Sequence, residues 1–302
     1  FNFKSFDLIT EQGFINNFGL YIKNFNTLVK NNNNSNSNSK MQIMPLLEFN
    51  SGLPLVNYNK QFKNNLEPKF SIRYNPLNIN NYYNSEEKII AANLFDIERL
   101  RINEAHEPGT SLTLGIDYKK ESLDNINRYF ETKIGTVLRN NEENQIPRKT
   151  TLNNKYSNYF GSIEGSWENQ FKIKYDFSID NDLKTLEYNS LNLNINKNDF
   201  FIDLNLYKED GIIGNENTIE NTIGYNIDNY NLLKFSTRRN KKINLTEFYD
   251  LVYEYKNDCL TAGVSYKKTF YTDRDLKPSE DLIFTITLFP ITTLEQNIGQ
   301  NF

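Results

Sequence analysis

The 302-residue chain is poor in the side chains that most chemical sites require. It has one cysteine, Cys259, and one histidine, His106. A single cysteine excludes an internal disulfide, and this inventory leaves little material for a zinc site or for histidine-dependent catalysis. The net charge of -4 at pH 7 argues against nucleic-acid binding. Because no catalytic constellation is visible, we expect a protein that is not an enzyme and has no metal or cofactor.

Long apolar runs are also missing. A transmembrane helix needs about 20 consecutive apolar residues, whereas the most apolar piece here, Leu282 to Phe289, has only the length of a strand. The mean hydropathy of -0.66 therefore argues against helical membrane spans. It does not argue against a membrane β-barrel, because barrel strands turn only every second residue to lipid.

What the chain does contain is a series of extended segments with alternating polarity. In Phe171 to Ile179 (FKIKYDFSI), apolar residues alternate with lysine, aspartate and serine. Toward the end, FYDLVYEY (Phe248 to Tyr255), CLTAGVSYKKTF (Cys259 to Phe270) and LIFTITLF follow one another, separated first by a short step and then by a charged loop. We therefore predict an all-β fold, an antiparallel transmembrane outer-membrane β-barrel of roughly sixteen strands, present here in part.

The links between these segments alternate in length, as in outer-membrane barrels. With the C-terminus assigned to the periplasm, the short links at 122–124, 168–170, 196–199, 228–229 and 256–258 become periplasmic turns. The loops near residues 31, 76, 139, 208–217, 238–244 and 272–281 then face outward. The link at 50–65 is too long for its place in this scheme.

Three further expectations concern single segments. Ala91 to Leu100 is expected to form a short helix over the barrel mouth, and Pro45 is expected to weaken its strand because proline removes a ladder donor. Since the chain opens at Phe1 without Met or a signal peptide, we interpret residues 1–290 as an N-terminally truncated barrel domain. Residues 291–302 are interpreted as a periplasmic C-terminal tail.

Two alternatives stay open. A soluble β-rich surface protein would show the same alternation, since half-buried sheets are common. So many long strands in series, with aromatic residues near strand ends, favour the membrane barrel. A passive outer-membrane porin or channel is the second alternative, and the pattern alone does not separate it from other barrels.

Three stretches resemble the C-terminal barrel domain of the LPS-assembly family LptD, also called the organic-solvent-tolerance family, of alphaproteobacterial type. They are LEPKFSIRYNP (Leu66 to Pro76), HEPGTSLTLGIDYKK (His106 to Lys120) and YEYKNDCLTAGVSYKKTFYTDRDLKPSEDLIFTITLFP (Tyr253 to Pro290). The resemblance implies a non-enzymatic barrel in the outer membrane of a Gram-negative bacterium that inserts lipopolysaccharide into the outer leaflet. The implied partners are lipopolysaccharide, outer-membrane lipids, an LptE-like plug lipoprotein and, through an N-terminal domain outside this chain, a periplasmic bridge protein.

The resemblance also implies roles for named residues. Cysteines at the turn of Cys259 form disulfides with a periplasmic domain in this family, and many members have two adjacent ones. Here Asp258 precedes Cys259 and Leu260 follows it, so the second disulfide is in doubt. Leu282 to Phe289 matches the last strand, which forms one side of a lateral gate for lipid.

On that strand the alternation assigns Leu282, Phe284, Ile286 and Leu288 to lipid and Ile283, Thr285 and Thr287 to the interior. Phe289 completes the strand. Separately, Arg238, Arg239, Lys241 and Lys242 form a basic loop on the assigned outer side, where lipid phosphates would lie. A solvated loop explains this basic cluster equally well.

Overall fold

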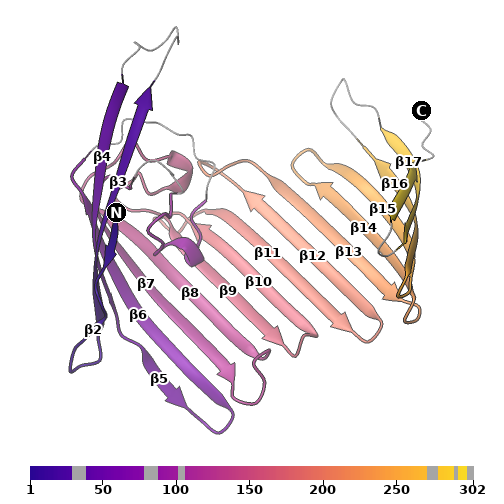
Figure 1. Ribbon diagram of the computed structural model, residues 1–302, viewed down its shortest axis with the longest axis horizontal. Helices are drawn as coiled ribbons and strands as arrows, with labels where there is room; N and C mark the ends of the chain where they lie inside the picture. The colour runs from indigo at the N-terminus through magenta and orange to yellow at the C-terminus, as the bar shows by residue number, and fades with distance from the viewer. Residues whose placement is uncertain (29–38, 78–87, 101–105, 271–277, 289–291, 298–302) are drawn as a thin grey trace. The chain divides into compact units, whose positions relative to one another are not determined.

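The computed structural model describes residues 1–28, 39–77, 88–100, 106–270, 278–288 and 292–297 (Figure 1). These residues form eighteen β-strands and two short 3-10 turns. The strand pairings whose register is resolved are all antiparallel, so the all-β antiparallel prediction is confirmed. Within the described ranges, no helix has the length and apolarity needed to cross a membrane.

The chain divides into two compact units. The first comprises residues 1–163, 176–188 and 210–214, and the second comprises 164–175, 189–209 and 215–302. The first unit contains β1 (Asn2–Lys4), β2 (Leu8–Ile9), β3 (Ile15–Leu28), β4 (Ser39–Gly52), β5 (Leu55–Tyr58), β6 (Phe62–Asn75), η1 (Ala91–Asn93), β7 (Gly109–Ser122), β8 (Tyr129–Arg139) and η2 (Arg148–Thr150). Residues of both units contribute to β9 (Tyr159–Trp167), β10 (Phe171–Ile179) and β11 (Leu186–Lys197). The second unit contains β12 (Phe200–Glu209), β13 (Asn217–Asn226), β14 (Asn231–Asn240), β15 (Leu245–Lys256), β16 (Leu260–Thr269), β17 (Ser279–Leu288) and β18 (Thr292–Asn297).

The link that seemed too long is mostly strand. β4 and β5 pair with β6 in one continuous register, interrupted only around Pro54. Proline is tolerated there because the pairing of β3 with β4 ends at Gly52, which leaves Pro54 at a sheet edge. The true link is a tight turn in which the Asn59 side chain accepts hydrogen bonds from the backbone N–H groups of Gln61 and Phe62, at 2.9 and 2.6 Å.

Two segments differ from expectation, and a third shows how its proline is accommodated. The helix expected at Ala91 to Leu100 is wrong: after the single turn η1, the carbonyl groups of Leu94 and Phe95 accept hydrogen bonds from arginine side chains instead of helical N–H groups. β4 runs unbroken through Pro45, since at that point it pairs with β3 alone. Residues 292–297, expected within a tail, form β18 on β17.

The two faces of the sheet in the second unit have opposite character. Residues directly opposite each other on paired strands share a face. One such row is apolar and consists of Ile202, Ile223, Phe235, Leu251, Tyr266 and Leu282. The adjacent row is polar and consists of Asp203, Thr222, Ser236, Asp250, Lys267 and Asp281. The apolar row lies on the exposed face, as expected of strands that turn one face to lipid.

In the first unit the inner face is covered by the connection between β6 and β7. We call its described residues, 88–100 and 106–108, the inserted segment; η1 stands in front of β7 and β8 in Figure 1. Leu94 and Leu100 of this segment pack with Val137 in a buried apolar cluster that also includes Met44, Ile89, Ala91, Ile146, Leu152 and Phe160. Gly115 and Gly135, paired across β7 and β8, permit this approach: a Cβ atom there would stand 2.6 Å from Phe95 and 2.5 Å from Leu94.

Candidate functional site: a buried ionic network and the hollow beside it

A row of polar residues crosses the inner face of the first unit. In the register of β4, β6, β7 and β8, Glu48 stands opposite Arg73, Arg73 opposite Ser111, and Ser111 opposite Arg139. None of these residues is more than 6% exposed. Buried charges require partners, and the inserted segment supplies them.

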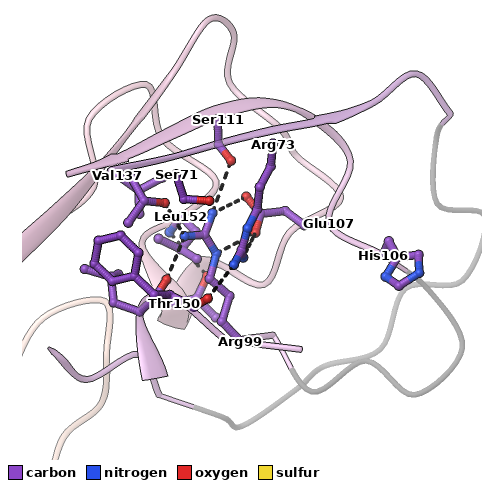
Figure 2. A network of polar contacts seen from close by, with 12 residues as sticks. Ser71, Arg73, Arg99, His106, Glu107, Ser111, Val137, Thr150 and Leu152 are labelled. Carbon is purple, nitrogen blue, oxygen red and sulfur yellow. Dashed lines mark hydrogen bonds and ion pairs between the residues drawn. The ribbon is translucent and has the colours of Figure 1, made fainter. Parts of the chain in front are cut away.

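Glu107, at the end of the inserted segment, is the centre of the network (Figure 2). Arg99 donates from Nε to Glu107 Oε2 and from Nη2 to Oε1, both at 2.6 Å, the two-pronged geometry that favours arginine–carboxylate pairs. Arg139 also donates to Glu107 Oε1, and Nη1 of Arg73 lies 3.9 Å from Oε2. One carboxylate therefore compensates charge on three guanidinium groups.

The remaining donors of the arginines tie the segment to the sheet. Arg73 donates from Nε to Glu48 at 2.9 Å and from Nη2 to the carbonyl of Phe95 at 2.7 Å. Arg99 donates to the hydroxyl groups of Thr113 and Ser111 at 2.8 and 3.2 Å. Removing one member of such a network leaves a buried charge unmatched, which typically costs about 3–5 kcal/mol. The network therefore fixes the inserted segment against the inner face.

Burial lowers the pKa of two ionisable groups of the inserted segment. It lowers the pKa of the Arg99 guanidinium to about 9, so this side chain stays charged at pH 7. It lowers the pKa of His106 to about 4, with the positive charge of Lys23 adding to the effect, so the imidazole is neutral. His106 is 3% exposed, and Figure 2 shows it set apart from the arginines and Glu107. Among the described residues, neither of its ring nitrogens has a hydrogen-bond partner.

Beside the network lies a hollow of about 390 Å³ with both polar and apolar lining residues. Phe95, Asp96 and Ile97 of the inserted segment form part of its wall, and Glu48 belongs to both the hollow and the network. The rest of the lining comes from Lys4, Ile15, Asn17, Tyr21, Asn50, Ser51, Gly52, Glu67, Lys69 and Phe70. No group of three or more His, Cys, Asp or Glu side chains in the described parts of the chain is placed to hold a metal ion.

The residues singled out from the sequence lie in the second unit. Cys259 is exposed, with a free thiol, in the short turn between β15 and β16. Its backbone N–H donates to the Asn257 side chain at 3.0 Å. Arg238 and Arg239 stand at the opposite end of the strands, near the end of β14. Lys241 and Lys242 follow in the connection to β15.

The basic group is already engaged in local contacts. Arg238 pairs with Glu247 at 2.9 Å and Arg239 donates to Asn244 at 2.5 Å. Lys242 donates to the carbonyl of Asn215 at 3.2 Å. These contacts join the ends of neighbouring strands, and they leave the four cations at one rim of the sheet.

The expected gate strand corresponds to β17, of which Phe289 lies outside the described residues. Phe284, Ile286 and Leu288 are exposed, whereas Ile283, Thr285 and Thr287 are partly buried on the other face. β17 pairs with β16 over ten residue pairs and with β18 over six. It is thus an interior strand, covered on one side by a shorter one.

Sequence reasoning missed the ionic network and the hollow. Arg73 and Arg139 each sit within a well-patterned strand at inward positions. Polar residues are normal at such positions of a barrel, so neither arginine signalled a special site. Arg99 and Glu107 come from an aperiodic stretch, so nothing in the sequence indicated that they meet.

Comparison with known proteins assigns the chain to a family. A two-faced, all-antiparallel sheet with an apolar exposed side defines the β-barrel class of outer-membrane proteins. The model of the family "LptD: LPS transport system D" matches residues 20–238, and the chain belongs to this family. It is accordingly an outer-membrane protein of lipopolysaccharide transport, and the family is a transport family, not an enzyme family.

The chain was also matched to solved structures, with low TM-scores. One is a mutant of the Rhodopseudomonas blastica porin, which is 8% identical, with 95% of this chain and 94% of that chain covered and a TM-score of 0.37. A structure titled "Asymmetric conductivity of engineered proteins" is 10% identical, with 98% of each chain covered and a TM-score of 0.32. No curated protein matches the chain.

Proposed function

We propose that this chain inserts lipopolysaccharide into the outer leaflet of the outer membrane. The proposal rests on two findings together: the chain belongs to the LptD family, and the register of its paired strands separates an apolar face from a polar one. Every strand from β12 to β17 presents an apolar face beside a polar one. The sugar-rich anionic head of lipopolysaccharide suits the polar face, and its acyl tails suit the apolar one.

The tails must leave where strand pairing is weakest, and we propose β17 as one side of that exit. Leu282, Phe284, Ile286 and Leu288 would meet lipid, and Ile283, Thr285, Thr287 and the terminal Phe289 complete the strand. Over the described residues, β18 makes six residue pairs with β17, compared with ten for β16. Because fewer backbone hydrogen bonds hold it, β18 is the strand that would separate first.

Cys259 supports a link to the periplasmic side. It is exposed in the short turn at the end of the strands assigned to the periplasm, where an oxidising compartment lets disulfides persist. We propose that it forms a disulfide with a periplasmic domain outside this chain, which in turn contacts a lipopolysaccharide bridge protein. An LptE-like plug lipoprotein would complete the complex.

At the opposite rim, Arg238, Arg239, Lys241 and Lys242 are proposed to lie near lipid phosphates. Each added cation favours an anionic surface, although the attraction falls off within a Debye length of about 8 Å at physiological salt. The salt bridge of Arg238 with Glu247 reduces this attraction but leaves the group with a net positive charge.

Photo-crosslinkers at Thr285 and Thr287, in the complete functional complex, test the proposal. Capture of lipopolysaccharide there, and not from crosslinkers at the outward positions Ile202 and Leu204 of β12, would support it. A disulfide lock gives a second test: Thr287→Cys with Thr293→Cys, whose hydroxyls are 3.2 Å apart, joins β17 to β18 while Cys259 is kept.

The matched control lock joins β16 to β17 through Thr269→Cys and Ser279→Cys, whose hydroxyls are 2.7 Å apart. We expect the β17–β18 lock to reduce surface lipopolysaccharide and the control lock to leave it unchanged. Equal transport with both locks, or crosslinkers that never capture lipopolysaccharide, would contradict the gate. Normal surface lipopolysaccharide after depletion of the chain would point to a passive channel instead.

A further inference from the structure

The hollow beside the ionic network has the mixed polar and apolar lining of a small-molecule site. Its volume of about 390 Å³ lies within the range of ~300–1,000 Å³ that is typical of ligand pockets. It opens on the inner face of the first unit, between β3, β4 and β6 and the inserted segment. We propose that it binds an uncharged sugar residue. This proposal deepens the proposed function and rests on it, because the sugar would belong to the lipopolysaccharide head.

The amide and carboxylate groups of the lining match vicinal hydroxyl groups. A sugar hydroxyl both donates and accepts hydrogen bonds, so its partners must offer both roles. Asn50 donates to the Oδ1 atom of Asn17 at 3.1 Å, and Asn17 donates to Asp7 at 3.2 Å. Each amide has two N–H donors and an oxygen with two lone pairs. These contacts therefore leave both amides with donor and acceptor capacity for a ligand.

Glu67 adds an acceptor to the lining. Its carboxylate lies over Gly52, where a Cβ atom would stand only 3.1 Å from Oε1. The absence of a side chain at Gly52 therefore leaves room for this carboxylate beside the hollow. Lys69, two residues further along β6, donates to Asp117 at 2.6 Å, which fixes its position at the wall.

Aromatic rings supply the apolar part of the lining. Phe95 of the inserted segment carries the ammonium of Lys69 at 4.6 Å from its ring centroid. Tyr21 lines the hollow from β3. Sugar rings present C–H groups on one face and hydroxyl groups at the edge, so a site that binds them combines aromatic surface with polar side chains.

The charges of the lining favour a neutral ligand over a phosphate. Lys4 and Lys69 face Glu48, Glu67 and Asp96, so the formal charge of the lining is -1. A phosphate group would meet this negative balance unfavourably. Arg73 pairs with Glu48 at 2.9 Å, but it is only 1% exposed and is engaged with the network.

The ionic network holds the walls of this hollow in place. Arg73 bonds both Glu48 and the carbonyl of Phe95, so one side chain positions one wall from the sheet and another from the inserted segment. A site whose walls are already fixed loses less conformational freedom on binding. The hollow is therefore preorganised: its walls hold the same positions before and after a ligand binds.

The test measures binding of a dephosphorylated core oligosaccharide to the complete chain in lipid nanodiscs, by saturation-transfer NMR and titration. We expect Glu67→Gln and Asn50→Ala each to raise the Kd about tenfold, as the loss of one hydrogen bond to a charged or well-placed polar group implies. Asn17→Ala is a further variant on a different strand. Glu131→Gln, on the same inner face but paired with Lys133 outside the hollow, should leave the Kd unchanged.

Three outcomes would overturn the proposal. They are no binding by the natural chain, equal Kd values for all variants, and tighter binding of the phosphorylated oligosaccharide. Heat-modifiable migration in gels verifies that each variant is folded. Because binding is measured without transport, failure here leaves the β17 crosslinking result, and with it the proposed function, unaffected.

Discussion

Arg99 donates one hydrogen bond to each carboxylate oxygen of Glu107, and both N···O distances are 2.6 Å. Both residues belong to the inserted segment, yet the same carboxylate also accepts from Arg139 of β8. A connection between two strands is thereby bonded to the sheet through charge as well as through apolar packing. Its position on the inner face depends on this carboxylate.

Glu107→Gln should therefore loosen the inserted segment. The amide keeps the shape of the side chain but leaves the charges of Arg99 and Arg139 uncompensated, so we expect the free energy of unfolding to fall by about 3–5 kcal/mol. Urea unfolding in detergent micelles measures this change. The matched control is Glu131→Gln, which removes a partly exposed pair worth about 0–1 kcal/mol. Equal effects of both substitutions would show that the network does not stabilise the fold.

Gly135→Ala should destabilise the chain by about 1–3 kcal/mol because the added methyl group overpacks a filled space. The new Cβ would lie 2.5 Å from Leu94 and 2.7 Å from the backbone oxygen of Leu114. Gly263→Ala is the control, since the nearest atom to its Cβ would be 3.7 Å away. Unfolding midpoints of the two variants should differ clearly, and a tolerated Gly135→Ala would mean that the inserted segment does not press on β8.

His106 should make stability dependent on pH in a defined window. Burial lowers the pKa of this histidine to about 4 from an ordinary 6.5, so the unfolded chain binds the proton first. Stability contributed by the neutral imidazole is complete above pH 6.5 and is lost as the pH falls toward 4, by an amount on the order of 3 kcal/mol.

His106→Gln removes this titration, and because the chain has no other histidine, the comparison isolates one group. Urea midpoints measured between about pH 7 and about pH 4.5 should fall more steeply for the natural chain than for the variant. Parallel curves would indicate that His106 is not buried in the folded state.

The assignment of faces in the second unit predicts that a lysine substitution destabilises the fold on the apolar row but not at the neighbouring position on the polar row. Ile223→Lys places a charge on the apolar row and should cost about 2–4 kcal/mol if that row lies near the membrane midplane. Thr222→Lys places the same charge on the polar row, beside Ser236 and Asp203, and should be tolerated. Folding yield in lipid vesicles measures both, and a reversed order would invert the assignment of faces.

The strand pattern could be predicted because alternation is a local property. Phe171 to Ile179 was identified from sequence with the same bounds as β10. Its apolar and polar residues alternate strictly, so the pattern indicates which face of the strand each residue lies on. Strand ends were less certain: β6 begins at Phe62, within the stretch 50–65 that was expected to be a link. Polar residues such as Asn64 and Asn65 break the alternation there, and only pairing with β7 shows that they are in a strand.

The sequence by itself determined which residues of each strand share a face, because a period of two leaves no other arrangement. The tertiary structure alone decided what covers the inner face of the first unit. Glu48 and Arg73 are 25 positions apart, and Arg139 reaches Glu107 across 32 positions. Such contacts arise from the register of paired strands and from a connection that folds back on them. Neither leaves a periodic trace in the sequence, so the network and its hollow emerge only when the chain is folded.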